Sequence, residues 1–141
     1  MSTLARAIEI AKTAHQHQTD KFGAPYWGHI SRVMNAGATE DEQICGVLHD
    51  LVEDTEWTFE QLAAEGFAPH IIEALRCVTK TSEEEDYDVF IQRIKPNPLA
   101  VKVKLNDLAD NMDIRRLPAV TENDLPRLNK YLRAYKALTS Q

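Results

Sequence analysis

The sequence has few cysteines and no long apolar run. Cys45 and Cys77 are the only cysteines among 141 residues, and both fall within apolar helical patterns. That placement favours buried free thiols in a reducing cytoplasm over a disulfide or a catalytic thiol. No segment has the pattern of a secretion signal, and no apolar stretch reaches the length that a membrane-spanning helix needs. We therefore expect a cytoplasmic protein that does not contact the membrane.

Positive charge is also scarce. The chain has 16 lysines and arginines against 22 acidic residues, which gives a formal net charge of -6. This balance argues against a general nucleic-acid binder and against binding to anionic membranes. It still allows a small phosphorylated ligand, because a metal ion can dominate the local field of a site. The sequence leaves the oligomeric state open.

No segment reads firmly as a strand, and there are no internal repeats and no linker. The length of 141 residues fits one domain with a sizeable core and leaves no room for a second catalytic domain. Apolar residues recur at helical spacing, and Gly and Pro mark the loops between these segments. This pattern predicts an all-α bundle of seven or eight helices. The expected helices cover residues 4–17, 27–37, 39–54, 58–66, 69–78, 87–94, 99–117 and 124–138.

Two helix starts carry capping-box signatures. Thr39 is followed three residues later by Glu42, and Thr58 by Gln61. Trp57 and Leu62 occupy the two positions of a hydrophobic staple around the second box. That gives Trp57 a structural role, which we prefer to stacking on a base.

One stretch concentrates ionisable residues within an apolar run. His49, Asp50, Glu53 and Asp54 lie within six residues, beside the helically spaced apolar residues of 44–52. Residues three and four apart share a helix face, so we expect one helix to carry both a buried stripe and a polar cluster. Four ionisable groups beside a core stripe are costly unless they bind something. The stretch therefore predicts part of a metal site.

A downstream segment repeats this arrangement. Within residues 99–117, an apolar stripe runs beside a second face that carries Asp107, Asp110 and Asn111. Two helices with carboxylates among core positions suggest one site between them.

Four motifs follow one another along the chain: Lys21…Gly23…Pro25-Tyr26…His29, His49-Asp50…Glu53-Asp54-Thr55, Val78-Thr79-Lys80, and Val103-Lys104-Leu105…Asp107…Asn111-Met112. In this order and near this spacing, they resemble the HD-domain phosphohydrolases. Within that family the likeness is to the hydrolase domain of RelA/SpoT-type proteins and to the stand-alone small alarmone hydrolases. The resemblance runs from about residue 14 to 117, and it implies a single HD-domain helical bundle.

The resemblance implies a metal held by His29, His49, Asp50 and Asp107. Two imidazoles and two carboxylates suit Mn²⁺ or Fe²⁺ better than a closed thiolate zinc site, and the family implies Mn²⁺. The alternatives are a backbone-bonded helix-start histidine for His29 and a buried capping or salt-bridged carboxylate for Asp107.

The resemblance also implies roles for four other residues. Glu53 and Asp54 would hold and deprotonate the attacking water, and Lys21 and Asn111 would contact the substrate's nucleotide and phosphates. A solvated helix end is the alternative for the acidic pair, although carboxylates at a helix C-terminus oppose the dipole.

The remaining histidines receive no role in catalysis. His15 lies on the apolar face of the first helix and is expected to be a core histidine, whereas His17 and His70 are expected at the surface or as caps. Asp110 could contact one of the metal ligands, but the sequence does not assign it this role.

Several positions depart from the alarmone-hydrolase pattern. Asp20 stands where an Arg is usual, Leu108 and Asp113 stand where basic residues are common, and Ile30 replaces a Pro. Three of these changes remove positive charge beside an anionic ligand, and the missing Arg is implied to contact guanine. The base preference is therefore open.

The leading hypothesis is a metal-dependent hydrolase that removes the 3′-pyrophosphate from guanosine tetra- or pentaphosphate. The alternatives are an HD phosphohydrolase for another nucleotide, such as an adenine alarmone hydrolase, a nucleotidase or a phosphodiesterase, and a metal-binding regulatory module without turnover. The Glu53-Asp54 pair argues against the module, which has no need of it.

Overall fold

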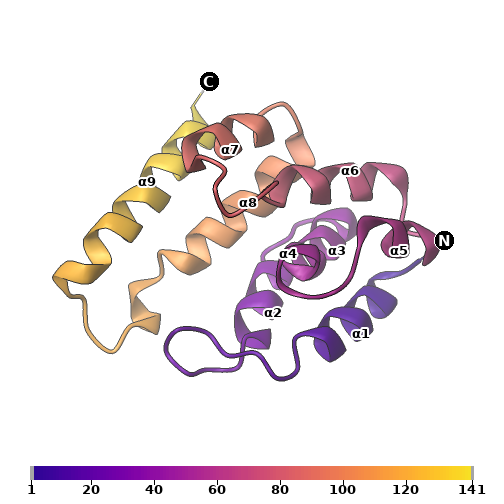
Figure 1. Cartoon of the computed structure of the whole chain (residues 1–141), viewed down its shortest axis with the longest axis horizontal. Coiled ribbons are helices and arrows are strands. Elements are labelled where there is room, and N and C mark those ends of the chain that lie inside the picture. The colour runs from indigo at the N-terminus through magenta and orange to yellow at the C-terminus, as the bar shows by residue number, and fades with distance from the viewer. Residues whose placement is uncertain (1, 141) are drawn as a thin grey trace.

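The computed structural model describes residues 2–140, and within them the regular structure is helical (Figure 1). The one β feature of this range is an isolated bridge between Thr19 and Pro25. The expected all-α bundle is confirmed, and it contains eight helices if α3 and α4 are counted as one. The elements are α1 (Leu4–Ala14), α2 (Trp27–Asn35), α3 (Glu40–Leu48), α4 (Leu51–Asp54), α5 (Phe59–Ala64), α6 (Pro69–Val78), α7 (Tyr87–Ile94), α8 (Pro98–Asn111), the 3₁₀ turns η1 (Ile114–Arg116) and η2 (Glu122–Asp124), and α9 (Leu125–Thr139).

Side chains at the helix starts explain most of these boundaries. The predicted capping box of Thr58 and Gln61 is confirmed in both of its hydrogen bonds. The box predicted at Thr39 forms only in part, because Glu42 accepts from the backbone N–H of Ala38 instead of that of Thr39. Further N-caps come from the side chains of Thr3, Asp86 and Asn97.

The helix predicted over residues 39–54 is interrupted at its functional end. Asp50 has φ -103° and ψ 1°, so α3 stops at Leu48 and a separate turn, α4, begins at Leu51. The Nδ1 atom of His49 lies 2.6 Å from the carbonyl oxygen of Gly46, which an uninterrupted helix would bond to the N–H of Asp50. The imidazole therefore replaces a helical hydrogen bond, and His49 and Glu53 do not share one continuous helix face.

The helix predicted over residues 99–117 is also shorter than expected. It ends at Asn111, and the side chain of Asp113 caps the N–H of Arg115 to begin η1. A cap at this position starts a new turn, so the helix ends six residues before residue 117, the end that the sequence predicted.

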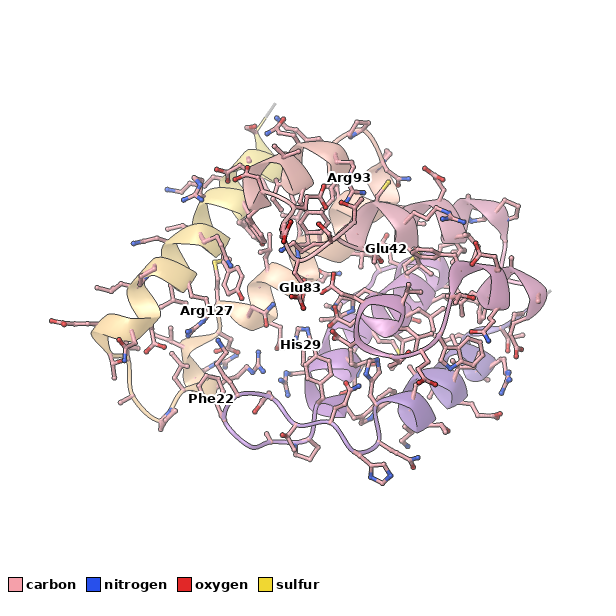
Figure 2. The ribbon with its side chains drawn as sticks, viewed as in Figure 1. Phe22, His29, Glu42, Glu83, Arg93 and Arg127 are labelled. Carbon is pink, nitrogen blue, oxygen red and sulfur yellow. The ribbon has the colours of Figure 1, made fainter. Side chains whose placement is uncertain are left out.

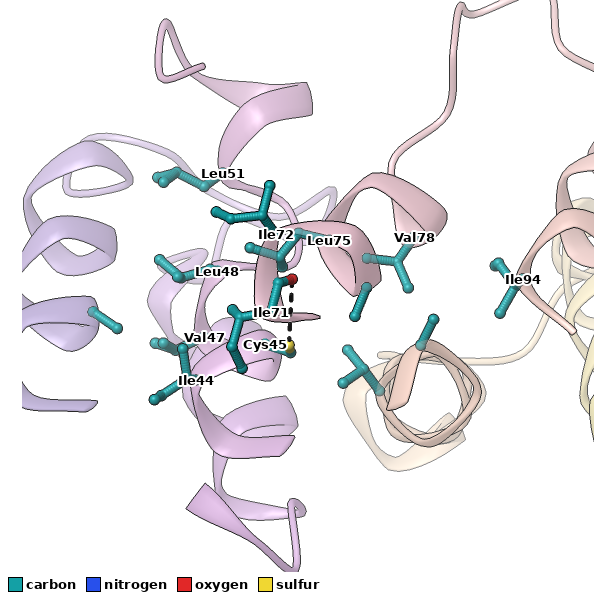
Figure 3. Packing of buried hydrophobic residues seen from close by; sticks show 14 of the residues in the cluster. Ile44, Cys45, Val47, Leu48, Leu51, Ile71, Ile72, Leu75, Val78 and Ile94 are labelled. Atoms are coloured by element: carbon teal, nitrogen blue, oxygen red, sulfur yellow. Dashed lines mark hydrogen bonds between the residues drawn. The ribbon is translucent and has the colours of Figure 1, made fainter. Parts of the chain in front are cut away.

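Helix α3 is the centre of the core, because it packs against α1, α2, α6 and α8. Cys45 is buried on α3 and Cys77 is partly buried on α6, and both thiols are free, as expected. Leu62 is fully buried and Trp57 packs against the core, which agrees with the structural role predicted for Trp57. None of the described helices is long and apolar enough to cross a membrane. Figure 3 shows the α3 residues Ile44, Cys45, Val47 and Leu48 with the α6 residues Ile71, Ile72, Leu75 and Val78.

Gly46 allows the close approach of α2 and α3. A Cβ atom at this position would lie 3.0 Å from the carbonyl oxygen of Val33 and 3.1 Å from the Cα atom of Met34. Both contacts are with backbone, which cannot move aside as a side chain can. The packing of α2, which carries His29, therefore depends on a glycine in α3.

We expect Gly46→Ala to lower the free energy of unfolding by about 1–3 kcal/mol, the usual cost of overpacking. Gly28→Ala is the matched control, because a Cβ there meets only the end of the flexible Arg32 side chain. That substitution should be neutral or should stabilise α2 by up to about 1 kcal/mol. Urea unfolding of both variants measures the difference, and equal stabilities would contradict the close-packing argument.

Candidate metal centre

Two buried imidazoles present one nitrogen each to the same point. His49 donates from Nδ1 to the carbonyl oxygen of Gly46, and His29 donates from Nδ1 to Oδ2 of Asp110, both at 2.6 Å. A carbonyl can only accept, and so can an ionised carboxylate, so in each neutral ring the Nε2 atom carries the lone pair. His29 projects from α2 toward the middle of the molecule (Figure 2). The local structure thus prepares both Nε2 atoms as ligands.

Two aspartates face these nitrogens. Asp50 Oδ2 lies 3.0 Å from His49 Nε2 and 3.7 Å from His29 Nε2. Asp107 Oδ1 lies 3.4 Å and 3.0 Å from the same two atoms. The ligand atoms of His29, His49 and Asp50 all lie within 4.8 Å of one another. The structure therefore brings together the four residues that the sequence nominated, with these three as the tightest group.

The donor set fits a divalent cation. The Nε2 atom of His49 is buried and has no hydrogen-bond partner in the described chain. Burial alone would lower the pKa of His49, but Asp50 and Asp107 outweigh it and hold that pKa well above the usual range. A metal ion between the nitrogens and the carboxylates would satisfy the same field with the imidazoles neutral. Two nitrogen and two oxygen donors leave coordination positions for water or phosphate.

Neighbouring side chains fix the two carboxylates. The hydroxyl of Tyr26 donates to Asp50 Oδ2 at 2.5 Å, and Lys104 donates to Asp107 Oδ2 at 2.9 Å. Asn111 donates to Asp107 Oδ1 at 3.1 Å. Asn111, expected to contact the substrate, is thus one helical turn after Asp107 and bonded to it.

Asp110, to which the sequence assigned no role, bonds to the proposed metal ligand His29. Besides accepting from His29, its carboxylate accepts from Arg32 Nε at 2.7 Å and from Arg116 at 3.1 Å. The sequence signal was its position three residues after Asp107, on the same helix face. Its partner His29 is 81 residues away along the chain, which no local spacing reveals.

Glu53 and Asp54, which follow the proposed ligand Asp50 in the chain, line a cavity of about 800 Å³. Glu53 accepts a hydrogen bond from the backbone N–H of Lys80 at 3.1 Å. Although Asp54 is open to the cavity, partial burial and the nearby carboxylates of Asp50 and Glu53 raise its pKa to about 7. A carboxylate with such a pKa can exchange a proton near neutral pH.

A second cavity, of about 290 Å³, is lined by Lys21, Asn111 and Tyr26. Tyr26 bonds to Asp50 and Asn111 bonds to Asp107, so two residues that line this cavity contact the carboxylates of the site. The two predicted substrate residues therefore lie in one cavity and the two predicted catalytic residues in the other.

The positions that depart from the family pattern have structural partners. Asp20 accepts from the N–H groups of Phe22 and Ala24 at 2.8 and 3.0 Å and from Arg116 at 3.2 Å. Leu108 is fully buried in the core. Asp113 pairs with Arg115 at 2.8 Å.

The other histidines are located as expected. His15 is buried, donates from Nδ1 to Oε1 of Gln18 at 2.7 Å and packs against the ring of Tyr26. His17 is exposed, and His70 is exposed and pairs with Asp41 at 2.9 Å.

No model of a known protein family matches the chain. Its curated relatives include a guanosine-3′,5′-bis(diphosphate) 3′-pyrophosphohydrolase of Aquifex aeolicus, 30% identical over 77% of this chain and 17% of the relative. A probable GTP pyrophosphokinase of Mycobacterium leprae is 30% identical over 82% of this chain and 16% of the relative. A guanosine-3′,5′-bis(diphosphate) 3′-pyrophosphohydrolase of Haemophilus influenzae is 29% identical over 86% and 20%. The chain spans a fifth or less of the length of these relatives.

A solved structure has the same fold. It is described as a metazoan ortholog of SpoT that hydrolyses ppGpp, and it matches with a TM-score of 0.80 and 22% identity, over 98% of this chain and 85% of that one. The fold is therefore that of a helical domain found in a solved SpoT ortholog. The chain is similar to RelA/SpoT-type proteins, which confirms the resemblance drawn from the sequence.

We expect Asp110→Ala to weaken binding of a divalent metal roughly 10- to 100-fold, because partners of metal-bound histidines commonly have effects of this size. Asp110→Asn, which keeps an acceptor for His29, should weaken it less. Asp113→Ala is the matched control, since it also removes an arginine-paired aspartate but none of the contacts of His29. Calorimetric titration of the metal-free proteins gives the affinities, and an equal effect of the two alanine variants would contradict the role of Asp110.

Proposed function

We propose that this chain is a metal-dependent hydrolase that removes the 3′-pyrophosphate from guanosine tetra- or pentaphosphate, releasing pyrophosphate and GDP or GTP. The observation that carries the proposal is the meeting of His29, His49 and Asp50 at one point, with Glu53 and Asp54 lining the adjoining cavity. The relatives named 3′-pyrophosphohydrolase support the same reaction. On this proposal the enzyme acts in the cytoplasm.

The proposed ligands of the metal are His29, His49, Asp50 and Asp107, and the proposed metal is Mn²⁺. Imidazole and carboxylate ligands are shared by Mn²⁺ and Fe²⁺, and the likeness to alarmone hydrolases favours the former. When bound, the ion would polarise a phosphoryl oxygen and lower the pKa of water.

Carboxylates of the chain would orient the attacking water and accept its proton. Asp54, with a pKa of about 7, accepts a proton from the attacking water as the new phosphorus–oxygen bond forms. The bond between phosphorus and the 3′ oxygen breaks, and that oxygen leaves with a proton from solvent. Glu53, held by the N–H of Lys80, orients the water. Lys21 and Asn111 would hold the nucleotide in the smaller cavity.

A second candidate is hydrolysis of another nucleotide, such as an adenine alarmone. The observation that favours it is the presence of Asp20 in the smaller cavity, where its carboxylate is bonded to Arg116 and to two backbone N–H groups. With those bonds in place, Asp20 supports its loop and does not supply the positive charge implied for guanine recognition.

A nucleotide panel with added Mn²⁺ tests the proposal. Pyrophosphate release from ppGpp is expected, whereas release from ppApp alone would favour the second candidate, and orthophosphate release from nucleoside monophosphates would indicate a nucleotidase.

Asp50→Ala and His49→Ala should abolish metal binding. Glu53→Ala should keep the metal and lose rate roughly 100-fold or more, as for loss of a proton-transfer or water-positioning group. Wild-type turnover by Glu53→Ala would refute its assignment.

The pH profile tests Asp54 separately. Only the ionised carboxylate can accept a proton, so kcat/KM should rise roughly tenfold per pH unit at low pH and level off near pH 7 or below, since a bound cation lowers the pKa. Glu53→Gln removes a charge that raises the pKa of Asp54, so its residual activity should level off at lower pH. An acid limb that this substitution leaves in place would contradict the assignment.

A further inference from the structure

The larger cavity has no assigned ligand. The nucleotide is proposed to lie in the smaller cavity with Lys21 and Asn111, whereas Glu53 and Asp54 open into the larger one. Tyr26 and Asn111 line the smaller cavity and bond to Asp50 and Asp107, whereas the acidic pair that lines the larger cavity follows Asp50 in the chain. A phosphoryl group held at the proposed metal centre would thus have its nucleoside on one side and the larger cavity on the other.

Lys80 is an unmatched cation in the wall of the larger cavity. Its backbone N–H is bonded to Glu53, which fixes it next to the acidic pair. Its ammonium group has no hydrogen-bond or ion-pair partner among residues 2–140. Burial, followed by the nearby ammonium group of Lys80, lowers the pKa of Lys130, so a second ammonium group lies near Lys80. An ammonium group without a carboxylate partner favours an anion beside it.

The wall around Lys80 is held in place by Arg93, whose side chain extends from α7 (Figure 2). Its guanidinium donates to the carbonyl oxygens of Arg76, Cys77 and Thr79 and pairs with Glu85 at 3.0 Å. These bonds occupy the carbonyls at the C-terminal end of α6, whose partial negative charge would otherwise oppose an anion. The segment that carries Lys80 is therefore braced before any ligand binds.

The cavity is poorly suited to a nucleobase. Phe59 is its aromatic residue, and the guanidinium of Arg76 already covers that ring, 4.5 Å from the centroid. Besides the acidic pair and the carboxylate of Glu83, the polar lining includes the hydroxyl groups of Thr79 and Thr81 and the ammonium group of Lys80. Cationic and hydroxyl donors match the oxygens of a phosphate better than the face of a base.

We propose that the larger cavity binds the terminal phosphoryl group of the pyrophosphate being released, with Lys80 as its principal contact. This inference rests on the proposed function, in which pyrophosphate leaves from the centre. It makes Lys80 a residue that selects a diphosphate over a monophosphate at the scissile position.

Binding of inorganic pyrophosphate, orthophosphate and GDP to the Mn²⁺-loaded protein, freed of excess metal, tests the subsite by calorimetry. Lys80→Gln should weaken pyrophosphate binding about tenfold, the effect of one lost charge-assisted hydrogen bond. Affinities for orthophosphate and GDP should stay within about twofold, because neither ligand needs the subsite. Lys80→Arg should restore much of the pyrophosphate affinity, and Lys102→Gln, at an exposed lysine of α8, is the matched control.

Unchanged pyrophosphate binding by Lys80→Gln, or an equal loss for all three ligands, would overturn the subsite. The nucleotide panel decides the proposed function independently. If the wild-type protein hydrolyses no alarmone but binds pyrophosphate through Lys80, the function fails and the subsite remains. If it releases pyrophosphate from ppGpp and Lys80→Gln binds pyrophosphate as wild type does, the function stands and the subsite fails.

Discussion

The hydrogen bond from His49 to the carbonyl of Gly46 is the interaction on which the site depends. It replaces a helical bond, ends α3 and sets the imidazole so that Nε2 faces Asp50 and Asp107. The same Gly46 has no side chain, which lets the backbone of α2 approach within a van der Waals contact. Since α2 carries His29, one residue of α3 orients both imidazoles, the first through its carbonyl and the second through its missing Cβ.

Charge balance around the imidazoles is arranged in layers. Asp50 and Asp107 face the Nε2 atoms, and Asp110 binds the opposite side of the His29 ring. Cations then compensate the aspartates from outside, with Lys104 on Asp107 and with Arg32 and Arg116 on Asp110. Buried carboxylates are tolerated only with such partners. The protein thereby keeps an acidic centre that is ready for a cation in spite of its burial.

Arg116 also connects the centre to the first loop. It bridges Asp110 and Asp20, and Asp20 in turn accepts from two N–H groups of the loop that holds Lys21. An aspartate at position 20 therefore does more than remove a positive charge from the smaller cavity. It ties the loop that is proposed to contact the nucleotide to the residue that orients His29.

The sequence by itself determined the helical class and most helix starts, because local periodicity and caps within three residues are visible in a single chain. It also marked the clusters around His49 and Asp107 as part of a site, whereas the full set with His29 came from the resemblance to the HD-domain phosphohydrolases. Only the tertiary structure decided the break at His49 and Asp50, the role of Asp110 and the partner of Asp20. Each of these depends on a hydrogen bond or ion pair with a side chain or carbonyl whose position no spacing fixes, such as His29 with Asp110 across 81 residues. The helix over 39–54 was expected to be continuous because its apolar spacing is helical throughout, and a side chain that competes for a backbone carbonyl leaves that spacing unchanged.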